Sequence, residues 1–161
     1  MKCLILLGLV CLAASATAQS AALQTAIADL AKAAKANADL IQKNLPLYTR
    51  IIGQTKLNAV TKFRNDVNIF FAATLRTKLT DSEDAALVKV IKTIISELKD
   101  WSNAIRDALA WRCPREARRG AEAFVAKIEA LVGSIVKVPA LNPASGALLA
   151  NYQAFKKVIN G

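Results

Sequence analysis

The sequence predicts an all-α fold, an antiparallel bundle of four long amphipathic helices plus a short C-terminal helix. Apolar residues recur at intervals of three and four from Ser20 onward, which is the spacing of one face of a helix. No alternation typical of a β-strand persists in the sequence. Of the 161 residues, 54% are hydrophobic, which is enough to fill one core.

The first 18 residues predict a secretory signal peptide. Lys2 supplies a positive start, residues 3–13 are almost purely apolar, and Ala16-Thr17-Ala18 matches a small-x-small cleavage site. Cleavage after Ala18 leaves residues 19–161 as a single helical-bundle domain, and we expect this domain to be secreted. We expect no transmembrane segment, because no later stretch has the roughly 18 apolar residues of a membrane helix.

Two helical segments form the first half of the domain. The first has one apolar stripe, made of Leu23, Ile27, Leu30, Ala34, Ala38, Ile41 and Leu45. Pro46 ends or sharply kinks this helix, because proline lacks the backbone N–H that a helix interior uses. The second segment runs from about Leu47 to Leu79, with a stripe of Val60, Phe63, Val67, Phe70 and Thr74 that Phe71 and Leu75 widen. Gly53 weakens its start, so residues 48–52 are a candidate for a separate turn.

The third helix is the best-defined element of the sequence. Thr80 and Glu83 have the spacing of a capping box, and acidic side chains in the next turn suit the positive end of a helix. Its stripe alternates steps of four and three over three heptads and consists of Leu87, Ile91, Ile94, Leu98, Trp101, Ile105 and Ala108. Such a seam predicts coiled-coil-like packing against neighbouring helices.

Pro114 separates the third helix from a fourth, since proline suits the first turn of a helix. The predicted core face of this fourth helix, which runs to about Lys137, contains Ala117, Ala121, Phe124, Ile128, Leu131 and Ile135. The stretch VPALNPASG predicts a loop. A short last helix from Ala147 to Ile159 carries Leu149, Tyr152, Phe155 and Ile159 on one face. In helix number, size and amphipathicity this outline resembles the exchangeable apolipoproteins of insects, without a shared motif.

We expect no enzymatic activity, no cofactor and no metal site. The chain contains no histidine, which removes His-based triads and nearly all catalytic zinc sites. Cys113 therefore has no histidine to activate it. Two carboxylate pairs seven residues apart, Asp100 with Asp107 and Glu122 with Glu129, are expected to face solvent. No catalytic residue is predicted.

Loss of the signal peptide changes the cysteine count. Cys3 and Cys11 leave with it, so Cys113 stands alone and no internal disulfide is possible. We therefore expect a monomer, or a dimer linked through Cys113.

The stretch ALAWRCPREARRG, residues 108–120, concentrates arginines at the start of the fourth helix. Each cation at this positive helix end should cost about 0.3–1 kcal/mol at low salt. Arg115, Arg118 and Arg119, together with free backbone N–H groups, therefore predict an anion-binding site. The plainer alternative is a helix–helix turn whose arginines are solvated. A processing site is disfavoured, because proteases cut extended chain and the helical pattern continues on both sides.

Charge and amphipathicity together predict the function. Loss of Lys2 lowers the formal net charge from +10 to +9, so the protein should be attracted to anionic surfaces, and no specific nucleic-acid partner is expected. We expect a non-enzymatic protein that binds an apolar ligand or a lipid surface. The residues predicted to surround an apolar ligand are Phe63, Phe70, Phe71 and Trp101. The alternatives are a cationic host-defence protein acting on anionic membranes, or a structural or interaction protein of an extracellular secretion.

Overall fold

The computed structural model describes residues 20–111 and 113–161, so the predicted signal peptide lies outside the described residues. The described chain forms α2 (Ala21–Lys43), α3 (Leu45–Ile52), α4 (Gln54–Thr74), α5 (Asp81–Ala110), α6 (Pro114–Val136), the 3-10 helix η1 (Pro139–Leu141) and α7 (Ala144–Asn160). No strand occurs in this part of the chain, and the predicted all-α class is confirmed.

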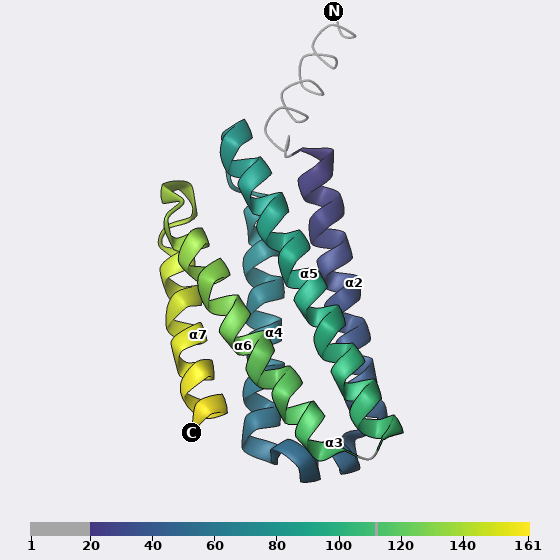
Figure 1. Cartoon of the computed structure of the whole chain (residues 1–161). Coiled ribbons are helices and arrows are strands. Elements are labelled where there is room, and N and C mark those ends of the chain that lie inside the picture. Colours follow the sequence, from purple (N-terminus) through teal and green to yellow (C-terminus); the bar gives the residue numbers. More distant parts are fainter. Residues whose placement is uncertain (1–19, 112) are drawn as a thin grey trace, which may run out of the picture.

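The five longer helices form an elongated bundle with α3 at its lower end (Figure 1). Around the bundle, α2 packs on α5, α5 on α6, α6 on α7, α7 on α4, and α4 again on α2. Most of these neighbours run in opposite directions, but α2 and α5 run in the same direction. Two hydrogen-bonded pairs show the parallel direction of α2 and α5. Ser20 pairs with Asp84 at the starts of the two helices, and Asn37 pairs with Ser102 further along both.

The ends of the helices follow local chemistry. The capping box predicted at the start of α5 is present, because the Glu83 N–H donates to Thr80 Oγ1 and the Thr80 N–H donates to Glu83 Oε1. Pro114 is the first residue of α6, as predicted. Pro46 does not kink α2: that helix ends at Lys43, and Pro46 occupies the first turn of α3. Gly53 then separates α3 from α4 with a φ of +86°, a conformation that favours glycine.

The predicted stripes form the core. Every residue of the α5 stripe is buried, and so are the aromatic residues of α4. In three stripes one predicted residue gives way to its neighbour. In α2, Asn37 is buried and Ala38 half-buried. In α7 the buried residue is Leu148, since it shares a face with Ser145 and Tyr152, while Leu149 lies half-buried at the edge. In α6, Val132 is buried and Leu131 lies at the edge.

A buried polar network joins α2, α4 and α5, and the apolar periodicity did not indicate it. Arg64 Nη1 donates to Asn37 Oδ1 at 3.0 Å, and Asn37 Nδ2 donates to Ser102 Oγ at 3.1 Å. The Arg64 side chain is only 9% exposed, and burial lowers the pKa of its guanidinium. Because buried polar groups need specific partners, this network specifies the register of the three helices.

Two helices approach each other closely at Gly120 of α6. A Cβ atom built on this glycine would lie 2.7 Å from the Cβ of Ala104 and 3.1 Å from Cδ1 of Trp101, both on α5. The absence of a side chain therefore lets α6 approach α5 at the level of Trp101.

We predict opposite effects for alanine at the two interior glycines of α6. Gly120→Ala should lower the free energy of unfolding, because overpacking costs about 1–3 kcal/mol and exceeds a helix-propensity gain of about 1 kcal/mol. Gly133→Ala is the matched control, since nothing lies within 4 Å of its Cβ position, and it should raise stability by about 0.5–1 kcal/mol. Urea unfolding followed by circular dichroism measures both changes. Equal stabilisation by the two variants would contradict the close packing at Gly120.

Candidate functional site

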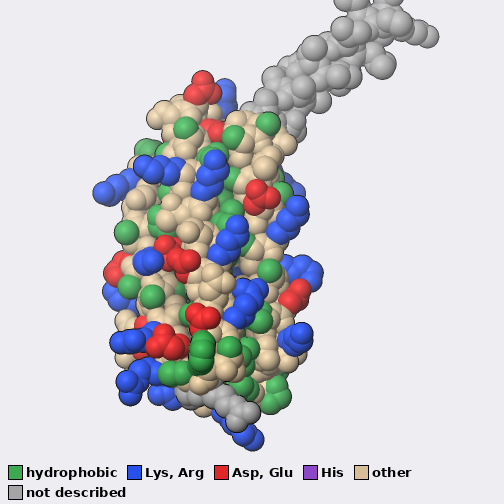
Figure 2. Space-filling model, turned by 45° about the vertical axis from the view of Figure 1, so that its right-hand side comes forward, with side chains coloured by type: hydrophobic (Ala, Val, Ile, Leu, Met, Phe, Trp, Pro, Cys, Tyr) green, Lys and Arg blue, Asp and Glu red, His purple; other side chains and the backbone are tan. Residues whose placement is uncertain are grey.

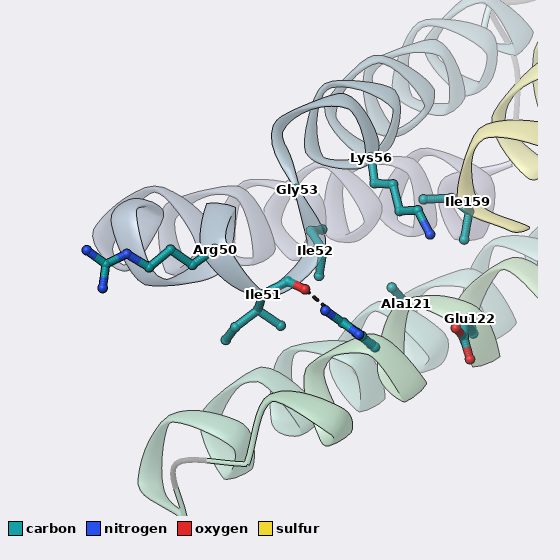
Figure 3. Close-up of a pocket in the computed structure, with 9 residues that line it drawn as sticks. Arg50, Ile51, Ile52, Gly53, Lys56, Ala121, Glu122 and Ile159 are labelled. Atoms are coloured by element: carbon teal, nitrogen blue, oxygen red, sulfur yellow. Dashed lines mark hydrogen bonds between the residues drawn. The ribbon is translucent and has the colours of Figure 1, made fainter. Parts of the chain in front are cut away.

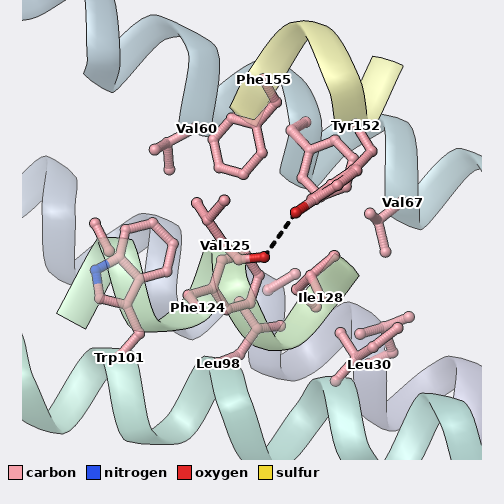
Figure 4. Close-up of a cluster of buried hydrophobic side chains, with 14 of the residues drawn as sticks. Leu30, Val60, Val67, Leu98, Trp101, Phe124, Val125, Ile128, Tyr152 and Phe155 are labelled. Carbon is pink, nitrogen blue, oxygen red and sulfur yellow. Dashed lines mark hydrogen bonds between the residues drawn. The ribbon is translucent and has the colours of Figure 1, made fainter. Parts of the chain in front are cut away.

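The four aromatic residues predicted to surround an apolar ligand lie in one hydrophobic core, where their ring–ring contacts form three groups. Phe63 stacks on Phe155 with ring centroids 4.7 Å apart, and its ring lies edge-on to Tyr152. Phe70 and Phe71 contact each other edge to face at 5.1 Å. Trp101 stacks on Phe124 at 5.1 Å, as Figure 4 shows.

Among the described residues, only small hollows adjoin these rings. The depression between α5 and α6 that Trp101 and Phe124 help to line has a volume of about 240 Å³. The cavity beside Phe63 and Phe155, between α4 and α7, has a volume of about 120 Å³. Sites for small molecules usually measure about 300–1,000 Å³. An apolar ligand at Phe63, Phe70, Phe71 and Trp101 therefore stays a prediction that requires the helices to separate.

The three arginines predicted to bind an anion have different surroundings. Arg118 Nε donates to the carbonyl oxygen of Ile51 at 2.8 Å, which ties α6 to the end of α3. Arg119 Nη1 lies 3.5 Å from Glu116 Oε1 and lines a depression between α5 and α6. Arg115 is exposed. Successive helical residues differ in direction by about 100°, so Arg118 and Arg119 leave the backbone of α6 on different sides. Joint anion binding by the three side chains stays a prediction.

Cys113 lies half-buried immediately before α6, at the N-cap position. The neighbouring Trp111 is the last described residue of the preceding segment. A disulfide between two chains through Cys113 stays a prediction.

Two large hydrophobic side chains are exposed at the lower end of the bundle. Trp111, at the end of α5, is 81% exposed, and Leu47 of α3 is 46% exposed. The other large hydrophobic residue exposed within the described chain is Ile69, on the flank of α4. Figure 2 shows hydrophobic side chains beside Lys and Arg side chains at this end.

Positive charge is concentrated at the same end. The described residues of segments 43–56 and 106–119 include two acids, Asp107 and Glu116, and seven cations, Lys43, Arg50, Lys56, Arg106, Arg115, Arg118 and Arg119. At the opposite end, segments 74–84 and 137–144 contain three cations and three acids. The two segments at the positive end thus carry a net charge of +5 among their described residues, while the two segments at the opposite end are neutral. We call this region, together with Trp111 and Leu47, the basic end.

A cavity of about 410 Å³ opens at the basic end, where the junction of α3 and α4 faces α6 and the last turn of α7 (Figure 3). The charged residues in its lining are Arg50, Lys56, Arg118 and Glu122. Of these, sequence reasoning singled out Arg118 as a binding residue. Arg50 and Lys56 were missed because they precede α6 by some sixty residues and show no motif of their own.

No protein-family model, curated protein or solved structure matches this chain. Within the described residues, no helix combines the length and the apolar character needed to cross a membrane.

Trp101 is tied to the basic end through Tyr48 of α3. Its Nε1 donates to Tyr48 Oη at 3.2 Å inside the core. Burial raises the pKa of Tyr48 to about 12, although this hydrogen bond partly offsets the effect. Tyr152, whose Oη donates to the Val125 carbonyl at 2.9 Å, also has its pKa raised to about 12, by burial and by the carboxylate of Glu129.

We predict that Tyr48→Phe lowers the free energy of unfolding by about 1–3 kcal/mol, because it leaves the buried Trp101 N–H without an acceptor. Tyr152→Phe is the comparison variant. It removes a donor but leaves a helix carbonyl, so the cost should be about 0.5–1.5 kcal/mol. Urea unfolding measures both values. A larger loss for Tyr152→Phe would contradict this assignment.

Alkaline pH should destabilise the fold. The folded state holds the pKa of both tyrosines above their ordinary value of 10, so their contribution is complete below pH 10. It is lost as the pH rises through 10 towards 12. We expect the urea midpoint to fall across this window in the native protein and to fall less in the Tyr48→Phe/Tyr152→Phe double variant. Parallel curves for the two proteins would contradict the role of the phenols.

Proposed function

We propose that this chain is a secreted, non-enzymatic helical bundle that binds anionic lipid surfaces through its basic end. The observation that carries the proposal is the exposed Trp111 beside a concentration of cations. Tryptophan favours the boundary between water and hydrocarbon, because its ring is apolar and its N–H needs a polar partner.

The charges at the basic end support the same proposal. A Lys or Arg near an anionic membrane contributes about 1 kcal/mol of attraction. Several such residues with few neighbouring acids give a weak, reversible and salt-dependent association, to which Trp111 and Leu47 add apolar contact. The two hydrophobic side chains make the attachment more than a purely ionic one.

The packing of the core favours a lipid surface over an apolar ligand held inside the bundle. Phe63, Phe70, Phe71 and Trp101 contact other core side chains, and the cavity beside Phe63 is small. A ligand at these rings would first have to displace packed side chains. Binding at the basic end requires no such rearrangement.

Vesicle co-sedimentation tests the proposal. We expect the native protein to bind vesicles that mix phosphatidylcholine with phosphatidylglycerol, and to bind pure phosphatidylcholine much less. Trp111→Ala should weaken binding about tenfold, equivalent to about 1.4 kcal/mol. Ile69→Ala is the matched control, because Ile69 is also exposed, at 68%, but lies on the flank of α4, and its loss should change little. Equal losses in the two variants would overturn the assignment to the basic end.

Salt and leakage separate this proposal from its alternatives. Binding should weaken between low and physiological salt, because exposed charges are screened. Release of a dye trapped in the vesicles would favour the host-defence alternative. Absence of binding at low salt would leave an extracellular structural or interaction role.

A further inference from the structure

We propose that the 410 Å³ cavity at the basic end binds the phosphate group of a single anionic amphiphile, with Lys56 and Arg118 as its cationic contacts. The inference deepens the proposed function and rests on it in naming a lipid as the source of the phosphate. Proteins that attach to membranes by charge alone need no such cavity, so the site would add headgroup recognition to surface binding.

The cations come from two helices. Figure 3 shows the Lys56 side chain extending from α4 towards Ile159 and Glu122. Arg118 of α6 is held at the Ile51 carbonyl by its hydrogen bond. The Arg50 side chain points away from these groups, so we assign it to the rim of the cavity. A small anion between α4 and α6 would therefore be approached from both sides.

Neither Lys56 nor Arg118 has an ion-pair partner within the described residues, where the ion pairs involve other cations. The Nε of Arg118 is occupied by the Ile51 carbonyl, which holds the planar guanidinium in place. Its two terminal nitrogens stay available for the forked contact that arginine makes with phosphate. An arginine restrained in this way loses less conformational freedom when it binds.

The helix ends at this cavity contribute little net potential. Gly53 separates the C-terminal end of α3 from the N-terminal end of α4, and the partial charges of these ends have opposite signs. The carboxylate of Glu122 opposes an anion, but it is outnumbered by the cations of the lining. The attraction for phosphate therefore comes from the side chains of Lys56 and Arg118.

The rest of the lining is apolar and selects an amphiphile over a free ion. It consists of Gly53 and of four core residues, Ile51, Ile52, Ala121 and Ile159. The cavity volume lies within the usual range for small organic ligands and exceeds the needs of a bare phosphate. A phosphate joined to glycerol and the start of an acyl chain suits both parts of the lining: the phosphate would contact the cations, and the acyl chain would contact the apolar residues.

Calorimetric titration with dihexanoyl phosphatidic acid, kept below its micelle concentration, tests the site on the mature protein, residues 19–161. We expect one ligand per chain and binding at least tenfold tighter than that of inorganic phosphate. Lys56→Gln should weaken binding roughly tenfold, since it removes one charge-assisted contact. The Lys56 ammonium makes no ion pair within the described residues, so this variant should keep the native fold. Arg118→Gln should weaken binding more, but it also cuts the bond to Ile51, so its unfolding curve is measured alongside.

Lys78→Gln is the matched control, because Lys78 is exposed in the loop at the opposite end of the bundle. Equal weakening by Lys78→Gln and Lys56→Gln would overturn the site, since it would reduce the interaction to general charge attraction. Equal affinities for inorganic phosphate and for dihexanoyl phosphatidic acid would overturn the assignment of a lipid as the source of the bound phosphate. If the titration gives no heat signal that saturates, the cavity does not bind the lipid and the site is overturned.

Trp111→Ala separates this proposal from the proposed function. It should reduce vesicle binding while leaving the affinity for dihexanoyl phosphatidic acid unchanged, because Trp111 does not line the cavity. If the native protein binds vesicles but does not bind the soluble lipid, only the proposal for the cavity is refuted. If the native protein binds the soluble lipid but not vesicles, only the proposed membrane binding is refuted.

Discussion

The burial of Trp101 is the interaction on which the lower half of the molecule depends. Its ring lies against Gly120 and Phe124 of α6, and its N–H is hydrogen-bonded to Tyr48 of α3. One side chain of α5 thus holds both the short helix and the start of α6. Without a glycine at position 120, α6 could not lie this close to α5, and the position of the arginines that follow Pro114 would change with it.

This arrangement explains how a surface feature is held by the core. The α3 segment has only eight residues, too few for a stable isolated helix, so it depends on tertiary contacts. Tyr48 anchors it from the inside, and Arg118 anchors it at its C-terminal end. Leu47 and Arg50 are therefore presented on a fixed support, which lowers the entropy lost on binding.

Periodicity predicted the elements well because helix faces are set by local spacing. The α5 stripe, its capping box and Pro114 at the start of α6 needed no knowledge of the partner helices. Asn37 and Arg64 were missed, since a polar residue on an apolar stripe is explained only by the partner it meets across the core. The same limit applied to the cavity at the basic end, because Lys56 and Arg118 come together only after folding. It also applied to the predicted apolar site, because the spacing of aromatic residues cannot distinguish a packed core from one with a cavity.

This molecule is elongated (Figure 1), and the segments at its two ends differ in charge. The field of a negatively charged surface turns such a molecule before it touches, so the encounters are already aligned. The protein would then stand upright, with the start of α2 and the α4–α5 loop pointing away from the surface. Neighbouring molecules in this posture would meet flank to flank, which leaves their far ends as a second, uniformly oriented layer.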